Sequence, residues 1–259
     1  MRITPSSIVA LVVVVAPAVS VSAQTSPSPG SPCGPALVAP LWAAVPEAER
    51  AGFSVEPPAD EDPRGTTAPR VTELELDGVA PREAVLGVDA IGDGSSAHDG
   101  HSAVWVLACR GTSWTSIGRL LFDNDWSWNG TLDDVPGLRV LRAETVAGLG
   151  HDLLRVEHVD VRGGADPRYV RRRFVLAHVI DGALVTALDL VVSEVTEAGP
   201  RRDGVVRATR TLVLRRGTLP SYHLTVRTVE ERRRARVCRT VLELDGRSFV
   251  PADAACAAR

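Results

Sequence analysis

The sequence contains no lysine and few aromatic residues, with four phenylalanines, two tyrosines and five tryptophans in 259 positions. Outer-membrane barrels need a uniformly apolar face on each strand and aromatic girdles at both membrane interfaces. The stretch GVVRATRTLVLRRG places arginine at both alternating positions, so neither of its faces is uniformly apolar. The sequence therefore disfavours that class. The absence of lysine by itself excludes no function, since GC-rich coding explains it.

Several catalytic and metal-binding motifs are also absent. The sequence has no GxSxG nucleophile elbow, no HExxH or CxxC motif, no glycine-rich phosphate loop and no haem-attachment motif. A Ser-His-Asp trio would have to be assembled from scattered residues, which nearly any chain of this length contains. The sequence therefore favours a non-enzymatic binding or structural module, with a secreted hydrolase of unidentified site as an alternative.

The N-terminus resembles an export signal. The apolar run Ile8–Val15 follows a positive Arg2 and precedes the small residues Val21-Ser22-Ala23, an order typical of signal peptides. This run is shorter than the roughly 20 residues of a membrane-spanning helix, and no later segment is apolar enough to span a membrane. We expect residues 1–23 to be a signal peptide and the mature chain to be secreted or periplasmic, without a transmembrane segment.

Four cysteines follow this leader, and an even number in an oxidising compartment predicts two disulfide bonds. Three pairings are possible. We favour Cys33 with Cys109 and Cys238 with Cys256, because the second pair flanks a turn expected at Asp245-Gly246. No cysteine spacing indicates a zinc site.

The composition changes along the chain and suggests its organisation. We expect a flexible linker (24–32), a segment with a short helix and a proline-rich acidic loop (33–69), and an antiparallel β domain (70–259) that forms one unit or two subdomains (70–160 and 161–259). Pro46–Gly52 has the proline, first-turn acids and terminal glycine of a short helix, and Pro40 is expected to interrupt any helix upstream.

Beyond residue 70 the apolar residues recur every second position. The runs VTELELDG, SAVWVLACRG and HDLLRVEHVDVRG alternate in this way, and turn residues such as Asp181-Gly182 and Asp245-Gly246 separate the later runs. The predicted fold class is mainly β: an antiparallel meander that forms a sandwich or barrel-like sheet, with a short N-terminal helix.

The segment Arg168–Glu194 predicts a β-hairpin with Asp181-Gly182 as its two-residue turn. Opposed residues should then have numbers that sum to 363, which pairs His178 with Val185, Leu176 with Ala187, Val175 with Leu188 and Phe174 with Asp189. Both faces of this hairpin are apolar near the turn, so we expect both to be covered. We expect His178 to be a hydrogen-bonded interior residue.

One stretch, FDNDWSWNGTLDD, carries oxygen-bearing side chains at every second position. Calcium prefers such ligands, and the candidates are Asp123, Asp125, Ser127, Asn129 and Asp134. The stretch differs from an EF-hand loop, because Trp128 and Asp134 stand where that loop needs glycine and glutamate. Trp126 and Trp128, with Trp114, are candidates for stacking on a sugar ring. Calcium-assisted binding of a glycan or cell-surface component is therefore the second hypothesis; core packing of the tryptophans is the simpler alternative.

Charge is divided unevenly between the two halves. Residues 24–167 carry 22 acidic side chains and 10 arginines, whereas residues 168–259 carry 10 acidic side chains and 18 arginines. The chain as a whole is mildly acidic, which argues against a nucleic-acid partner. The arginines of the last quarter form either an anion-binding patch or a solvated face that pairs with the acids of the first half: Arg227, Arg232, Arg233, Arg234, Arg236 and Arg239.

Two weaker patterns in the sequence concern metal ligands and a repeat unit. The histidines and acids at 98–101 and 151–152 would supply metal ligands if the fold brought them together, although their spacing matches no zinc motif. The run VTELELDGVAPREAVLGV, Val71–Val88, resembles the calcium-loop-and-strand unit of FG-GAP/VCBS-type propeller repeats. That resemblance implies β structure, but Leu76-Asp77-Gly78-Val79 lacks most of the acids that such a calcium loop uses.

Overall fold

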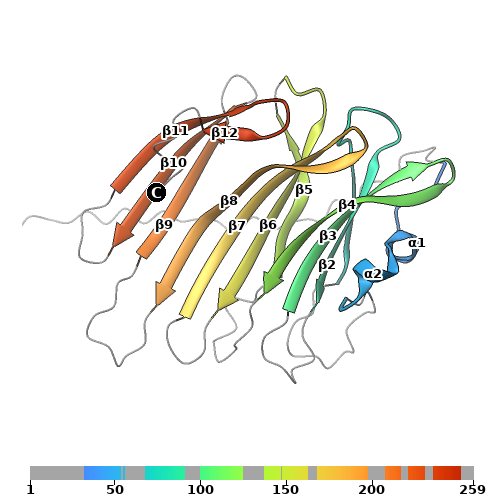
Figure 1. Ribbon diagram of the computed structural model, residues 1–259, viewed down its shortest axis with the longest axis horizontal. Coiled ribbons are helices and arrows are strands. Elements are labelled where there is room, and N and C mark those ends of the chain that lie inside the picture. The colour runs from blue at the N-terminus through green and yellow to red at the C-terminus, as the bar shows by residue number, and fades with distance from the viewer. Residues whose placement is uncertain are drawn as a thin grey trace, which may run out of the picture.

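The computed structural model holds two short helices and twelve strands in the residues it describes (Figure 1). The described residues are 32–53, 55, 68–90, 100–124, 137–146, 148–162, 168–197, 208–216, 221–230 and 236–251. The helices are α1 (Val38–Ala44) and α2 (Glu47–Arg50). The strands are β1 (Arg70–Leu74), β2 (Glu83–Ala90), β3 (Gly100–Arg110), β4 (Ser113–Asn124), β5 (Gly137–Thr145), β6 (Asp152–Arg162), β7 (Arg168–Ile180), β8 (Ala183–Glu197), β9 (Ala208–Arg216), β10 (Ser221–Glu230), β11 (Arg236–Leu244) and β12 (Phe249–Pro251). The mainly β fold class is confirmed.

The strands form two antiparallel sheets in which neighbours in sequence are neighbours in space. The first sheet has the order β1-β2-β3-β4 and the second has the order β12-β11-β10-β9-β8-β7-β6-β5. Figure 1 shows this meander as a continuous colour gradient across the second sheet. The chain changes sheet between Asn124 and Gly137, and β6 pairs with β7 without a break at residue 160.

The main core lies between the two sheets and makes the arrangement sandwich-like. Its buried residues come from both sheets: Leu74, Leu76, Val85, Val104, Val106, Phe122, Leu138, Leu154, Val156, Val175, Ala177 and Val179. Gly118 on β4 allows a close approach to β8, because a Cβ atom at this position would lie 2.3 Å from the Cβ of Leu184. Any larger residue at 118 would force the sheets apart.

A second core covers the outer face of the first sheet. Leu41 and Val45, which are one helical turn apart, are buried against β2 and β3, and Trp105 is fully buried in the same cluster. The indole Nε1 of Trp105 donates a hydrogen bond to Glu49 Oε2 at 2.9 Å, which ties α2 to the sheet. The helices therefore act as a cover for this face.

A third core, which we call the outer cluster, covers the far face of the second sheet. It consists of Val146, Leu153, Phe174, Leu176, Ala187, Leu188, Leu242 and Phe249, with Leu149, Leu190 and Leu244 packed against it. The β11–β12 hairpin contributes Leu242 and Phe249 to this cluster. Strand β7 is therefore buried on both faces, as its apolar sequence predicts: every residue from Phe174 to Val179 is at most 5% exposed.

The helical predictions were right at one place and wrong at another. Helix α2 lies inside the predicted Pro46–Gly52 segment, and Gly52 has the positive φ of +85° that favours glycine after a helix. The expectation that Pro40 interrupts any upstream helix was wrong, because α1 includes it. Pro40 is the third residue of α1, in the first turn, where the N–H group that proline lacks has no intrahelical partner. Neither helix has the length or apolar character needed to cross a membrane.

The β7–β8 hairpin has the predicted turn but not the whole predicted register. Asp181 and Gly182 have φ angles of +53° and +74°, as a type I′ turn requires, and His178 pairs with Val185 as predicted. Beyond Ala177 the register shifts by one residue at a bulge, so the predicted pairs beyond it are wrong. Leu176 pairs with Leu188, Val175 with Asp189 and Phe174 with Leu190. The bulge buries both Ala187 and Leu188 and moves Asp189 to where its carboxylate binds the Arg173 guanidinium.

Candidate functional site

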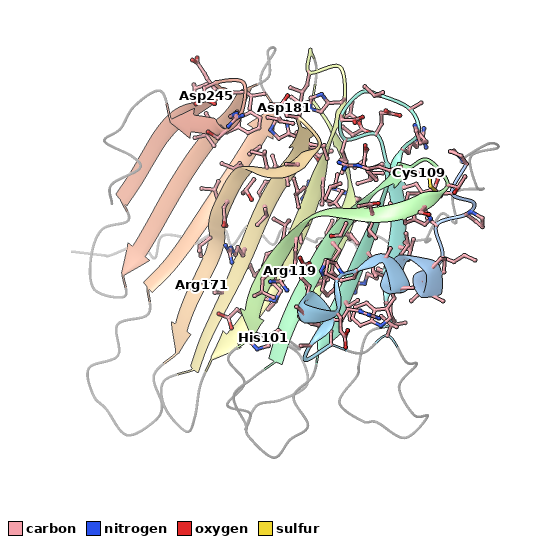
Figure 2. All side chains as sticks on the ribbon, turned by 45° about the vertical axis from the view of Figure 1, so that its right-hand side comes forward. His101, Cys109, Arg119, Arg171, Asp181 and Asp245 are labelled. Atoms are coloured by element: carbon pink, nitrogen blue, oxygen red, sulfur yellow. A yellow bond between two sulfur atoms is a disulfide. The ribbon has the colours of Figure 1, made fainter. Side chains whose placement is uncertain are left out.

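Four hairpin turns meet at one end of the molecule, which we call the turn end. They are the β1–β2 turn (75–82), the β5–β6 turn (146–151), the β7–β8 turn at Asp181-Gly182 and the β11–β12 turn (245–248). Figure 2 shows Asp181 and Asp245 at this end and His101 at the opposite end. Hydrogen bonds between side chains and backbone join the turns, and two histidines lie at their centre.

His178 and His151 form a hydrogen-bonded pair between turns. His178, near the end of β7, is 1% exposed, whereas His151 precedes β6 and is partly exposed. The Nε2 atom of His151 lies 3.2 Å from Nδ1 of His178, and Nε2 of His178 lies 2.9 Å from the carbonyl oxygen of Arg247. The expectation that His178 is a hydrogen-bonded interior residue is confirmed.

The Arg247 carbonyl fixes which ring nitrogens carry protons. A carbonyl oxygen only accepts, so His178 Nε2 must donate to it. In a neutral ring the other nitrogen, Nδ1, then has a lone pair and must accept, and His151 Nε2 is its donor. The result is a directed chain of two hydrogen bonds, in which His151 donates to His178 and His178 donates to the β11–β12 turn.

The buried carboxylate of Glu83 lies at the same end. Its Oε2 atom accepts the Leu76 N–H at 2.8 Å, and the Leu76 carbonyl accepts the Val179 N–H at 3.2 Å. The Asp152 N–H donates to the Glu75 carbonyl at 2.8 Å. The β1–β2 turn is therefore joined to both β7 and β6, directly beside the two histidines.

Burial shifts the pKa values of Glu83 and His151 in opposite directions. Desolvation raises the pKa of Glu83, which is 2% exposed, to about 7, and nearby Asp77 adds to the shift. Desolvation also lowers the pKa of His151, and the neighbouring His178 lowers it further. Both shifts favour the uncharged form.

A second set of polar side chains lies between the sheets toward the opposite end, where Ser102 and His158 are buried and Asp89 is half-buried. The Asp89 carboxylate on β2 accepts hydrogen bonds from the Ser102 hydroxyl at 2.6 Å and the Leu138 N–H at 2.9 Å, so it joins the first sheet to β5. The His158 ring stacks on Phe122 with centroids 4.8 Å apart. Burial, together with the positive charges of Arg173 and Arg139, lowers the pKa of His158 to about 3.

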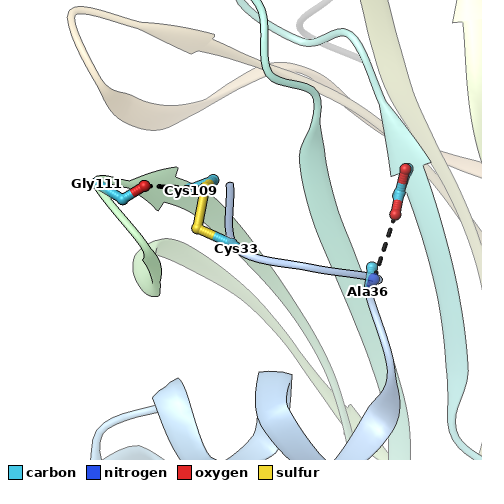
Figure 3. The surroundings of a disulfide bond; sticks show 5 residues. Cys33, Ala36, Cys109 and Gly111 are labelled. Atoms are coloured by element: carbon cyan, nitrogen blue, oxygen red, sulfur yellow. Dashed lines mark hydrogen bonds between the residues drawn. A yellow bond between two sulfur atoms is a disulfide. The ribbon is translucent and has the colours of Figure 1, made fainter. Parts of the chain in front are cut away.

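The Cys33–Cys109 disulfide, one of the two predicted pairs, is formed (Figure 3). It ties the start of the described chain to the end of β3, and nearby the Ala36 N–H donates to a carboxylate oxygen of Glu73 at 3.3 Å. Cys238 lies on β11, which pairs with β12, the last strand of the described chain. Cys256 is outside the described residues, so its pairing with Cys238 stays a prediction.

The structure describes only part of the predicted calcium and tryptophan site. Trp114 on β4 is 8% exposed and packs in the core beneath the helices, which leaves little of its indole for a sugar ring. Asp123 pairs with His101 through the β4 and β3 backbones, and its side chain is not described. The remaining candidates lie outside the described residues: Asp125, Trp126, Ser127, Trp128, Asn129 and Asp134.

The described residues contain no cluster of three or more side chains suited to holding a metal. His101 lies at the end opposite the turns that hold His151 (Figure 2), so these two histidines are not brought together. His98 and Asp99 are outside the described residues, as are the side chains of the arginine patch at 227–239.

Sequence reasoning missed the histidine pair, because the pair depends on which residues of β6 and β7 lie opposite each other. Leu154 pairs with Ala177 and Val156 with Val175, so a β6–β7 register of this kind places His178 opposite residue 153, close to His151. Comparison of the chain with family models, with characterised proteins and with solved structures gave no match.

Proposed function

We propose that this chain is an exported, non-enzymatic binding or structural module, in which a two-sheet framework presents the segment between β4 and β5. The Cys33–Cys109 disulfide supports export, because such bonds persist in oxidising compartments and are rare in the cytosol. The strongest support for a framework role is that its interior polar side chains hydrogen-bond to the backbone. Glu83, Asp89 and His178 each hydrogen-bond to backbone atoms of another strand or turn.

The described residues on either side of 125–136 belong to the framework. At one end Asp123 and Asn124 pair with His101 and Gly100 in the first sheet. At the other end the Leu138 N–H, on the second sheet, donates to Asp89 on the first. A segment fixed at both ends on rigid strands is a common way to position binding residues.

A second candidate function is calcium-assisted binding of a glycan or cell-surface component by this segment. Its sequence supplies the carboxylates of Asp125 and Asp134 and the indoles of Trp126 and Trp128. Because Trp114 is buried, the candidate relies on Trp126 and Trp128 for ligand contact. This candidate function differs from the first because it requires calcium.

A segment replacement tests the framework proposal. In the variant, a Gly/Ser linker of equal length replaces residues 125–136 in the mature chain. We expect an unchanged melting temperature and loss of binding in a glycan and cell-surface array. Loss of folding, retained binding, or a parent chain that binds nothing would contradict the proposal.

Calcium dependence is tested separately by melting curves with calcium and with a chelator. A ligand at 100 times its dissociation constant adds about 2.7 kcal/mol of stability, which is roughly 5 to 10 °C in a domain of this size. Asp125→Asn with Asp134→Asn should abolish that shift, and Trp126→Ala with Trp128→Ala should retain it while losing glycan binding. An unchanged melting temperature of the parent chain with calcium and with chelator would contradict the calcium hypothesis.

A further inference from the structure

The His151–His178 pair can hold only a limited number of protons. In the neutral pair His151 Nε2 donates and His178 Nδ1 accepts across 3.2 Å. One added proton is accommodated, because one of the two facing nitrogens still has a lone pair. A second proton removes the last acceptor and places two positive rings in contact. The hydrogen bond therefore cannot survive when both rings are charged.

The charged groups around the pair do not remove this limit. They are Asp77 on the β1–β2 turn, Glu83 at the start of β2, Asp152 at the start of β6, Asp181 on the β7–β8 turn, and Asp245 and Arg247 on the β11–β12 turn. Asp77 and Asp152 favour a charged His151, but desolvation and His178 outweigh them and lower its pKa. Asp181 lies 3.8 Å from the Arg247 guanidinium, and Asp245 accepts backbone N–H groups of its own turn.

In the described residues, the turn that carries His151 (146 and 148–151) is also held by backbone bonds, by packing, and at its base by the Thr145 hydroxyl, which donates to Asp152 Oδ1 at 2.7 Å. Its described backbone bonds run from the Leu149 N–H to the Val146 carbonyl and from the Asp152 N–H to the Glu75 carbonyl. Gly148 and Gly150 have φ angles of +82° and +80°, a backbone conformation that glycine adopts more readily than other residues. Val146 and Leu149 pack on the outer cluster. This turn therefore packs on one edge of that apolar cluster, and the histidine bond joins it to β7.

We propose that the His151–His178 hydrogen bond is an acid-released clasp, and that the turn carrying His151 is a flap that it holds closed over the outer cluster. At neutral pH the directed chain to the Arg247 carbonyl keeps the flap closed. Below the ordinary histidine pKa of about 6.5, the open form binds one more proton than the closed form. Acid therefore exposes the edge of the outer cluster near Phe249 and Leu242 while His178 keeps its bond to Arg247.

The test is hydrogen exchange of the Leu149 and Asp152 amides, detected by NMR at pH 7.5 and 5.0 and corrected for intrinsic rates. It compares the full mature chain with two variants. His151→Gln keeps a side chain that can donate to or accept from His178 but cannot be protonated. His151→Ala removes the bond and leaves the flap unclasped.

We expect the parent chain to lose protection about tenfold per pH unit once the open form binds the extra proton. His151→Gln should stay protected at both pH values, and His151→Ala should exchange rapidly at both. Equal protection of the parent chain at both pH values would overturn the proposal, as would a protected His151→Ala. Acid-induced loss of protection in His151→Gln would also overturn it, since His158 and the other titrating groups are unchanged in that variant.

Discussion

Replacement of Glu83 by glutamine should stabilise the protein at alkaline pH and leave it nearly unchanged in acid. The Glu83 carboxylate is 2% exposed, and desolvation raises its pKa from 4.5 to about 7. A group whose folded pKa is raised binds protons more tightly in the folded state. Its contribution to stability is therefore complete below pH 4.5, is lost as the pH rises toward 7, and is absent above that value.

The size of the effect follows from the shift of about 2.5 pKa units. At about 1.4 kcal/mol for each unit, the charged form costs the folded state about 3 kcal/mol relative to the unfolded chain. Glutamine is neutral at every pH, and its side-chain oxygen can still accept the Leu76 N–H. The difference in unfolding free energy between Glu83→Gln and the parent chain should therefore grow by about 2 to 3 kcal/mol from pH 5 to pH 8.

The assay is urea unfolding at half-unit intervals of pH, followed by far-ultraviolet circular dichroism. Glu47→Gln is the control, because Glu47 is exposed and its replacement should leave the pH profile unchanged. Glu83→Leu removes the acceptor as well as the charge, so it should lose about 1 to 3 kcal/mol relative to Glu83→Gln at every pH. Parallel curves for the parent chain and Glu83→Gln between pH 5 and 8 would refute the reasoning.

Three further predictions concern how the framework is held together. Cys33→Ala with Cys109→Ala opens a link across a sequence separation of 76 residues, and it should lower the unfolding free energy by about 2 to 4 kcal/mol in urea. Reaction of the denatured, unreduced parent chain with a thiol reagent should find no free thiol, and two free thiols would contradict the second predicted disulfide. Gly118→Ala places a Cβ atom against the Cβ of Leu184, which cannot rotate away, and should cost about 1 to 3 kcal/mol or more. Thermal melting measures this loss, with exposed Thr115→Ala on the same strand as control; an unchanged melting temperature would show that β4 and β8 are not in close contact.

The sequence predicted those features that local chemistry determines. Asp181-Gly182 specifies its turn because both residues must adopt positive φ, and alternation of apolar residues predicted the strands on either side. The burial of β7 on both faces followed from its continuous apolar sequence. These signals operate over a few residues and need no knowledge of the partner strand.

Features set by tertiary contact were harder to predict. The bulge after Ala177 depends on packing of Ala187 and Leu188 against the outer cluster. One indication was present, because the predicted register placed the carboxylate of Asp189 opposite the ring of Phe174. The shifted register lets Asp189 bind Arg173 instead.

The missed helix and the missed histidine pair have different causes. Helix α1 was missed because a proline in the first turn of a helix does not break it. The spacing of Leu41 and Val45 fits one buried helical face. For the pair, His151 and His178 are 27 residues apart, and no tight-turn motif joins β6 to β7 to reveal their register. Only the pairing of whole strands brings them together.

The turn end responds to acid in two opposed ways, and this opposition keeps the proposed release local. As the pH falls from 8 to 5, Glu83 gains a proton that the folded state prefers, because protonation removes the buried negative charge. Over the same range the His151–His178 pair approaches the proton count at which its hydrogen bond fails. The contribution of Glu83 to global stability rises while the flap opens, because the two groups act on different turns. In Glu83→Gln this compensation is absent, so the same acidification should lower the stability of the whole domain more steeply than in the parent chain.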